Sequence, residues 1–354
     1  MKIVFFTQAS ELGASSRYRV YQFVPYLEGE GITCTVLPAI PKKYHSLYFY
    51  SKNVFVKGIF TFYVLIKRLV QLRYVHQADY VFLQKPVMPH IYPIIEWIVH
   101  KMGKKIIFDF DDAIFSRSPK WGSGEANDMT VDHGFKKIVE WSYCVHAGNA
   151  YLADIAKKYN TCVKVMPTVI DTDYYAMLEK IKKDEVFTIG WMGSPTTLFY
   201  LDQLQTVFKR LAKEKKCILK IVGAEDYAIP GVQVICEKWS LESEKDILST
   251  FDLGIAPLDD GPWSKGKCGL KILLYMATGV PVIASPYGVN AHILCDGDLG
   301  MLAKNEDDWY ESIERLFEDV DLRASYIQKA RSHVEKEYSV QSAYKKIIEV
   351  LKAG

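Results

Sequence analysis

Short runs of β-branched and aromatic residues recur along this chain between longer amphipathic stretches, and this alternation restricts the fold more than any other feature. Such runs suit strands that are buried on both faces, whereas the stretches between them place apolar residues at helical spacing. The alternation predicts parallel sheets that are covered by helices on both faces.

The predicted strands form two successive sets. The first set covers residues 2–7, 33–37, 80–83, 105–110, 144–147 and 162–165, and the second covers residues 186–191, 218–222, 232–235, 253–256, 281–284 and 300–302. We therefore expect an α/β protein with two doubly wound, Rossmann-like domains that face a cleft, and ligands bound beyond the carboxyl ends of the strands. The 354 residues are enough for two such domains. The predicted boundaries are 1–168 and 169–335, with a terminal helical segment over 336–354.

Composition excludes several classes of protein. The net charge of +2 argues against a dedicated nucleic-acid binder, because such domains usually carry a strong basic excess. Seven cysteines without CxxC pairs or metal-like spacing fit free thiols in a reducing compartment, so the cytoplasm is expected. The most apolar window, 54–72, is interrupted by Lys57, Lys67 and Arg68, so no membrane span is predicted.

The segment 251–288 carries the densest chemistry. A predicted strand is followed by a loop rich in glycine and lysine and then by a helix, which directs backbone N–H groups and the positive end of a helix dipole to one place. Such a site can hold a nucleotide diphosphate without a metal ion. The alternative is a solvated start of a helix. The candidate donor-binding residues here are Lys265, Lys267, Cys268, Gly269, Leu270 and Lys271.

Two further junctions of this kind lie in the second half of the chain. Gly193, Ser194 and Thr196 follow its first strand, and they either bind a ligand or cap the next helix. Gly223 closes the next strand, which suits either a flat ligand or a tight turn.

In the first half, Gly13, Arg17, Tyr18 and Arg19 follow the first strand and open a helix. The segment lacks the GxGxxG fingerprint of dinucleotide binding. Arg17 and Arg19 are candidates to bind phosphate, and the alternative is ordinary ion pairing at the surface.

Three carboxylates, Asp109, Asp111 and Asp112, follow another apolar strand. They could hold a metal ion, act on an acceptor or cap the next helix, and burial there would suit a general base. We favour the acceptor role or capping, because the basic loops already supply positive charge for phosphates.

The segment 31–78 contains no Asp or Glu but interleaves lysines and arginines with aromatic residues. This mixture suits an anionic membrane surface, which we assign to residues 41–75, and fits RNA less well. The alternative is a core helix whose lysines extend to solvent.

Three segments resemble the GT-B glycosyltransferases, specifically the retaining family called group 1 or family 4. Residues 165–173 are similar to the family's P-N-G-V-D-x-x-x-F linker, with Thr168 and Val169 in place of Asn and Gly. Residues 189–194 resemble the opening of its second domain. The most specific match is 275–285, YMATGVPVIAS, which is similar to E-A-M-A-x-G-x-P-V-V-A-S.

The resemblance implies a nucleotide-sugar donor on the second domain, an acceptor on the first, and transfer with retention and without a metal. Lys267 and Lys271 would then stabilise the departing diphosphate, and Arg17 and Arg19 would assist from the opposite side of the cleft. The terminal helices would pack back on the first domain.

Two departures from the family pattern concern the donor site. Gly266 and Leu274 stand where the family commonly has two glutamates, and the usual Arg and Lys are not evident in 193–201, so Lys265, Lys267 and Lys271 are expected to replace them. A family histidine is also missing, with Asp109 or Asp111 near its place.

The expected function is a cytoplasmic hexosyltransferase, peripheral on the inner face of the membrane, that builds a surface polysaccharide or glycolipid on a saccharide or lipid-linked acceptor. No cofactor, metal or nucleic acid is expected. The alternatives are a catalytically silent nucleotide-sugar-binding subunit and, with less support, a nucleotide-sugar epimerase.

Overall fold

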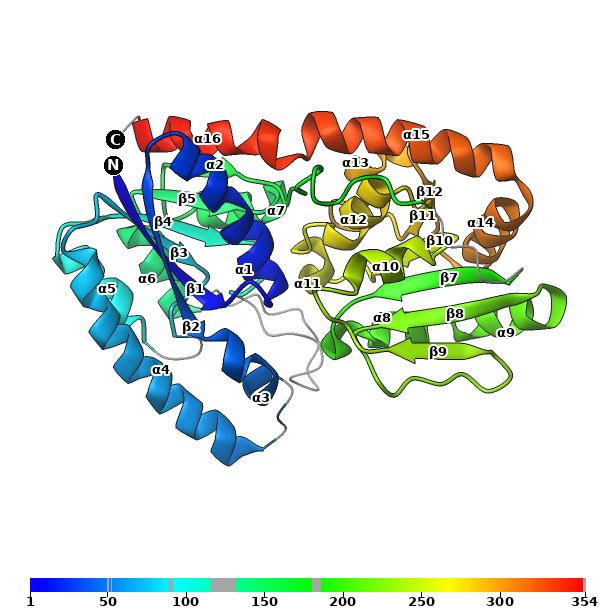
Figure 1. Cartoon of the computed structure of the whole chain (residues 1–354), viewed down its shortest axis with the longest axis horizontal. Helices are drawn as coiled ribbons and strands as arrows, with labels where there is room; N and C mark the ends of the chain where they lie inside the picture. Colours follow the sequence, from blue (N-terminus) through cyan, green and yellow to red (C-terminus); the bar gives the residue numbers. More distant parts are fainter. Residues whose placement is uncertain (50, 52, 89–91, 116–131, 180–185, 353–354) are drawn as a thin grey trace. The chain divides into compact units, whose positions relative to one another are not determined.

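The computed structural model describes residues 1–49, 51, 53–88, 92–115, 132–179 and 186–352 (Figure 1). The chain divides into two compact units. The N-terminal unit is Met1–Thr168 with Ala343–Gly354, and the C-terminal unit is Val169–Ser342.

The N-terminal unit is built on a parallel sheet of six strands in the order β2-β1-β3-β4-β5-β6. The strands are β1 Lys2–Ala9, β2 Thr33–Ile40, β3 Tyr80–Gln84, β4 Lys105–Phe110, β5 Cys144–Ala147 and β6 Val163–Val165. Its helices are α1 Ala14–Arg19, α2 Val24–Gly29, α3 His45–Phe49, α4 Val54–Val75, α5 Ile94–Lys101, α6 His133–Trp141, α7 Ala150–Ala156 and most of α16 Val340–Lys352.

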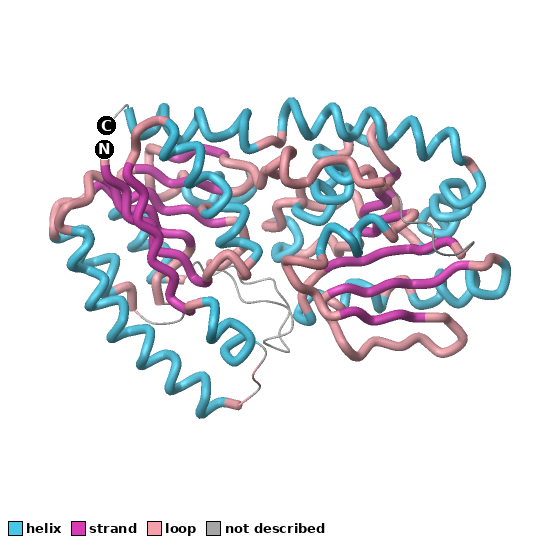
Figure 2. The backbone as a smooth tube through the Cα atoms, viewed as in Figure 1, coloured by secondary structure: helices cyan, strands magenta, loops and turns pink. Residues whose placement is uncertain are grey.

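The C-terminal unit has a second parallel sheet of six strands in the order β12-β11-β10-β7-β8-β9 (Figure 2). The strands are β7 Phe187–Met192, β8 Cys217–Val222, β9 Val234–Glu237, β10 Leu253–Ala256, β11 Val282–Ala284 and β12 Met301–Leu302. The helices are α8 Phe199–Asp202, α9 Gln205–Glu214, α10 Glu244–Ser249, α11 Pro262–Lys265, α12 Leu270–Thr278, α13 Asn290–Ile293, α14 Glu306–Glu318 and α15 Val320–Glu337.

Each of the twelve predicted strands is present, so the prediction of two doubly wound sheets is confirmed. The predicted second strand ended at Leu37, but β2 continues through Pro38 to Ile40. Proline lacks the N–H that a central strand needs, and β2 tolerates it because it is an edge strand of the sheet.

The cores follow from the strand composition. All residues of β3 and β5 are buried, as expected for a parallel sheet covered on both faces. In the C-terminal unit, Trp191, Phe208 and Trp309 belong to one buried cluster between the sheet and its helices.

The terminal helix α16 packs within the N-terminal unit from Ala343 onward. The Tyr80 hydroxyl on β3 donates to the Leu351 carbonyl at 2.9 Å, and the rings of Tyr26 and Tyr344 lie 5.4 Å apart. Among the helices in the described parts of the chain, we find none with the length and apolar character to cross a bilayer.

Strand order fixes where each unit can hold a ligand. The order reverses between β1 and β3 in the first sheet, and between β7 and β10 in the second. At such a reversal, neighbouring crossovers leave on opposite faces and open a crevice at the carboxyl ends of the strands. These two positions are the candidate sites.

Candidate functional site

In the C-terminal unit, two loops leave the same edge of the sheet. β7 ends at Met192 and continues into Gly193, and β10 ends at Ala256 and continues through residues 257–269 into α12. The strands are parallel neighbours, so both loops start at their carboxyl ends. This is the segment in which the sequence predicted donor-binding residues.

Two glycines make room for aromatic rings on this part of the sheet. Gly190 and Gly254 are register partners on β7 and β10. A Cβ atom on Gly190 would lie 2.1 Å from the Phe251 ring, and one on Gly254 would lie 2.5 Å from the Tyr275 ring. The space beside Gly254 holds the Tyr275 ring, whose hydroxyl accepts a 2.9 Å hydrogen bond from Met192 N. The end of β7 is thereby fixed to α12.

The N-terminus of α12 lies beside Gly193. Its N-cap is Gly269, whose φ of 70° is one that glycine adopts without strain. A Cβ atom on Gly193 would lie 2.9 Å from Lys271 Cε, and Lys271 Nζ is 5.2 Å from the centre of the Trp191 ring. The first turn, which begins at Leu270, has N–H groups that the helix itself cannot satisfy, so it adds partial positive charge to that of Lys271.

The two other predicted lysines have different surroundings. Lys267 Nζ lies 4.7 Å from the centre of the Trp263 ring, whereas Lys265 Nζ forms a 3.2 Å ion pair with Asp260. Lys265 is therefore held toward a carboxylate of its own loop. Of the three, Lys271 is the lysine whose contacts place it at Gly193.

The loop after β10 is tied to the helix after β7. Ser264, which is buried, donates to Asp259 Oδ1 at 2.5 Å, and its Oγ lies 2.8 Å from the Tyr200 hydroxyl on α8. Asp259 Oδ1 also accepts from Gly261 N at 3.0 Å. These bonds hold the two loops of the site in one arrangement.

The remaining candidates contribute in different ways. A Cβ atom on Gly223, whose φ is 95°, would lie 2.2 Å from Gly193 O, so glycine is needed there for close packing of two loops. Ser194 Oγ lies 2.7 Å from Thr196 Oγ1, and the Ser194 side chain makes no capping bond to the turn that follows. Cys268 is buried, with its Sγ 3.7 Å from Gly266 O.

At the two positions where the family has glutamates, this chain offers no carboxylate. Gly266 is the C-cap of α11, and Leu274 is buried on α12.

In the N-terminal unit, Lys85 lies at the carboxyl end of β3, next to the point where the strand order reverses. Its φ is 63°, which is uncommon for a residue with a side chain. Its N–H donates to the Asp109 carbonyl at 2.8 Å, and its Nζ lies 2.8 Å from Asp111 and 2.7 Å from Asp112. Burial alone would lower the pKa of Lys85, but these two carboxylates raise it above its ordinary value.

Asp109 and Arg19 form a buried ion pair. Arg19 Nε donates to Asp109 Oδ2 at 2.9 Å, a second guanidinium nitrogen contacts Oδ1, and the third donates to the Met166 carbonyl at 2.6 Å. Burial raises the pKa of Asp109, and the charge of Arg19 opposes that rise. Both side chains are nearly inaccessible, so their position does not support the direct substrate contacts expected for them.

The other candidates of this unit lie on or before α1. Arg17 donates to the Glu11 carbonyl at 3.0 Å and its guanidinium lies 4.7 Å from the centre of the Tyr18 ring, which is buried. Gly13 is the N-cap of α1, and a Cβ atom there would lie 2.6 Å from Ala9 Cβ.

Several residues of the two sites were missed by the sequence analysis. Gly190 and Gly254 are the most informative, since glycine inside a strand signals the close approach of another group. Lys85 could have been noticed as a lone cation at the end of an apolar strand. The pairing of Arg19 with Asp109 had no signal, because 90 residues separate them.

Comparison with known proteins agrees with the C-terminal site. Residues 185–319 match the family model of group 1 glycosyl transferases, which confirms the resemblance for that part of the chain. No curated protein matches the sequence.

Solved structures match the whole chain at low identity. HepE of Anabaena, in complex with UDP and glucose, is 15% identical with a TM-score of 0.70, and the match covers 100% of both chains. Sucrose-phosphate synthase of Thermosynechococcus elongatus is 12% identical, with a TM-score of 0.71 over 100% of this chain and 98% of the other. The lipopolysaccharide outer core galactosyltransferase WaaB is 13% identical, with a TM-score of 0.62 over 100% and 99%. The chain therefore has the GT-B fold of two Rossmann-like domains.

Proposed function

We propose that this protein is a glycosyltransferase that moves a hexosyl group from a nucleotide-sugar donor, bound by the C-terminal unit, to an acceptor bound by the N-terminal unit. The observation that carries the proposal is the meeting of Gly193, Lys271 and the first turn of α12 where the strand order reverses. This arrangement lies inside the segment that matches the group 1 family. HepE, which is similar in structure, was solved with UDP-glucose.

Lys271 and the first turn of α12 would hold the diphosphate. A cation and a helix N-terminus stabilise negative charge most when it develops on the leaving group, which is where glycosyl transfer needs it. Gly193 leaves room for the donor and for Lys271, and Lys267 adds charge from the same loop. We propose that transfer proceeds with retention and that these groups take the place of a metal ion.

The acceptor would be a saccharide or a lipid-linked saccharide. Asp111 and Asp112, held by Lys85, are the carboxylates that we assign to its hydroxyl groups. The Arg19–Asp109 pair would keep β4 and α1 in place beneath them. The product would be a surface polysaccharide or glycolipid, made by a cytoplasmic enzyme that is peripheral on the inner face of the membrane.

The donor assignment is tested by thermal shift and calorimetry with UDP, GDP, ADP and TDP sugars, since a bound ligand stabilises the folded state. Lys271→Ala should weaken binding of the preferred donor, and Lys271→Arg should retain part of it. Lys304→Ala, which removes an exposed lysine of the same unit, is the control. Equal donor affinity in Lys271→Ala and the control would remove the diphosphate assignment.

A second candidate is a catalytically silent nucleotide-sugar-binding subunit, which is favoured by the lack of carboxylates at Gly266 and Leu274. Slow release of free sugar from the donor alone would exclude it. A nucleotide-sugar epimerase has less support. It would convert the sugar of the donor into its epimer when the donor is incubated alone.

A further inference from the structure

Helix α4 exposes a row of large apolar side chains, which an ordinary surface helix does not. The face that packs on the N-terminal unit buries Phe60, Val64 and Val75 together with two polar side chains, Arg68 and Gln71. The opposite face exposes large apolar side chains, and Phe55, Ile59 and Phe62 are 84%, 70% and 67% exposed. Ile66 and Leu69 continue this outward row at helical spacing, and we call the five residues the α4 stripe. A helix that is apolar on its outer face requires a cover.

Arg68 prevents the helix from turning its stripe inward. Its guanidinium donates to the Leu37 carbonyl of β2 at 2.7 Å, to the Thr7 carbonyl of β1 at 2.6 Å and to Gln71 Oε1 at 2.9 Å. Rotation of α4 would break these bonds and leave a buried cation unpaired, which is costly. The stripe is therefore held outward by the same side chain that attaches the helix to the sheet.

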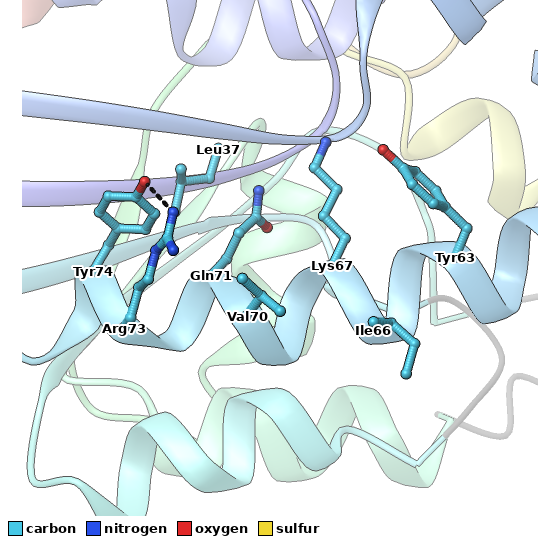
Figure 3. Close-up of a pocket in the computed structure, with 8 residues that line it drawn as sticks. All are labelled: Leu37, Tyr63, Ile66, Lys67, Val70, Gln71, Arg73 and Tyr74. Atoms are coloured by element: carbon cyan, nitrogen blue, oxygen red, sulfur yellow. Dashed lines mark hydrogen bonds between the residues drawn. The ribbon is translucent and has the colours of Figure 1, made fainter.

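Cations flank the stripe. A groove of about 400 Å³ lies between α4 and β2, with Lys67 and Arg73 among its lining residues. Figure 3 shows Tyr63, Lys67 and Arg73 rising from one flank of α4 toward the strand that carries Leu37. Lys67 Nζ lies 5.8 Å from the Tyr63 ring centre and donates to the Ala39 carbonyl of β2 at 3.3 Å, and the Arg73 guanidinium lies 4.8 Å from the Tyr74 ring centre. Cations next to tyrosine rings suit the headgroup layer of a bilayer.

We propose that α4 lies in the plane of an anionic membrane, with the α4 stripe among the acyl chains and with Lys67 and Arg73 at lipid phosphates. This proposal rests on the proposed function, because it identifies α4 as the element, and anionic lipid as the surface, that would hold the glycosyltransferase at the membrane. Within the segment assigned to the membrane, residues 50 and 52 lie outside the described structure. The geometry comes from α4 alone.

The charges favour a bilayer over a second copy of the chain. A twofold contact between two α4 helices would bring like charges together, because symmetry sets the same patch against itself. The segment 31–78 supplies no Asp or Glu to neutralise them. An anionic lipid surface provides both the apolar cover and the opposite charge.

The stripe is tested by flotation of the full chain with phosphatidylcholine vesicles, with and without an equimolar share of phosphatidylglycerol. The wild type should bind the anionic vesicles and lose binding at high salt. The triple variant Ile59→Ser, Phe62→Ser, Ile66→Ser should bind them about tenfold more weakly or worse, since membrane affinity scales with buried apolar area. Val320→Ser, which removes a side chain 63% exposed in the C-terminal unit, should bind like the wild type.

The double variant Lys67→Gln, Arg73→Gln should lose the preference for phosphatidylglycerol. Equal binding of the triple variant and the wild type would overturn the proposal, as would no binding of the wild type to anionic vesicles at low salt. A dimer in sedimentation velocity that the triple variant abolishes, without lipid binding, would assign the stripe to a second copy instead. Donor affinity is measured separately, without lipid, and reports only on the C-terminal unit. Failure of the membrane proposal can therefore be distinguished from failure of the glycosyltransferase assignment.

Discussion

Lys271 packs against Gly193 so closely that a single added methyl group at position 193 would lie 2.9 Å from Lys271 Cε. The same methyl group would lie 2.6 Å from the Trp191 ring. Neither distance occurs in a relaxed protein, so a side chain at position 193 must displace its neighbours. Because the Trp191 ring is buried, Lys271 is the neighbour that can move.

Gly193→Ala should therefore weaken donor binding more than it weakens the fold. Overpacking of this kind costs about 1 to 3 kcal/mol, and if the strain is relieved by moving Lys271, affinity falls about tenfold. Calorimetry with UDP, GDP, ADP and TDP measures it. Gly29→Ala is the control, since a Cβ atom there meets nothing within 4 Å. Unchanged affinity in Gly193→Ala would show that the diphosphate lies elsewhere.

Gly190→Ala and Gly254→Ala should act on the fold itself. Each added Cβ atom would enter an aromatic ring, that of Phe251 or that of Tyr275. We expect each variant to lose about 1 to 3 kcal/mol of unfolding free energy, measured by urea denaturation. Gly29→Ala serves again as the control, and stability equal to that of the control would mean that the Phe251 and Tyr275 rings do not need the space beside these glycines.

The sequence predicted the two sheets because a strand buried on both faces must be apolar, and a run such as 105–110 is short, apolar and bounded. It could not predict the Arg19–Asp109 pair, since nothing local distinguishes a carboxylate aimed at a substrate from one aimed at an arginine 90 residues away. The basic and aromatic character of 31–78 could be read from the sequence. The face that α4 turns to solvent could not, because it too depends on contacts with distant residues. A helix with apolar residues all round gives no periodic signal, and Arg68 decides its orientation only through carbonyls of distant strands.

Removing either partner of the Arg19–Asp109 pair should be strongly destabilising. Arg19→Met leaves a buried carboxylate without its cation, and the loss for breaking one side of such a pair is about 3 to 5 kcal/mol. The double variant Arg19→Met, Asp109→Leu should be more stable than Arg19→Met, because no buried charge remains. Urea denaturation compares the wild type, Arg19→Met, Asp109→Leu and the double variant. A double variant less stable than both single variants would assign the pair a net stabilising role instead.

Lys85→Gly should be less destabilising than Lys85→Met, although both remove the ion pairs to Asp111 and Asp112. The φ of 63° at position 85 costs a residue with a side chain about 1 kcal/mol or more, and glycine avoids that cost. Thermal unfolding of the two variants decides the comparison. If Lys85→Met were the more stable, the strain at this position would be negligible.

His146 should make the protein less stable at mildly acidic pH. It is buried on β5, where burial and the charge of Arg19 lower its pKa to about 3. In the unfolded chain it takes up a proton near pH 6.5, so between these values the unfolded state binds more protons and stability rises with pH. As pH falls from 6.5 toward 3, His146 should remove up to about 1.4 kcal/mol of unfolding free energy per pH unit.

Urea denaturation from pH 7 to pH 4 should give a flatter profile for His146→Leu than for the wild type, whereas His76→Gln, at an exposed histidine, should follow the wild type. Parallel profiles for His146→Leu and the wild type would mean that the pKa of His146 is the same in the folded and the unfolded chain.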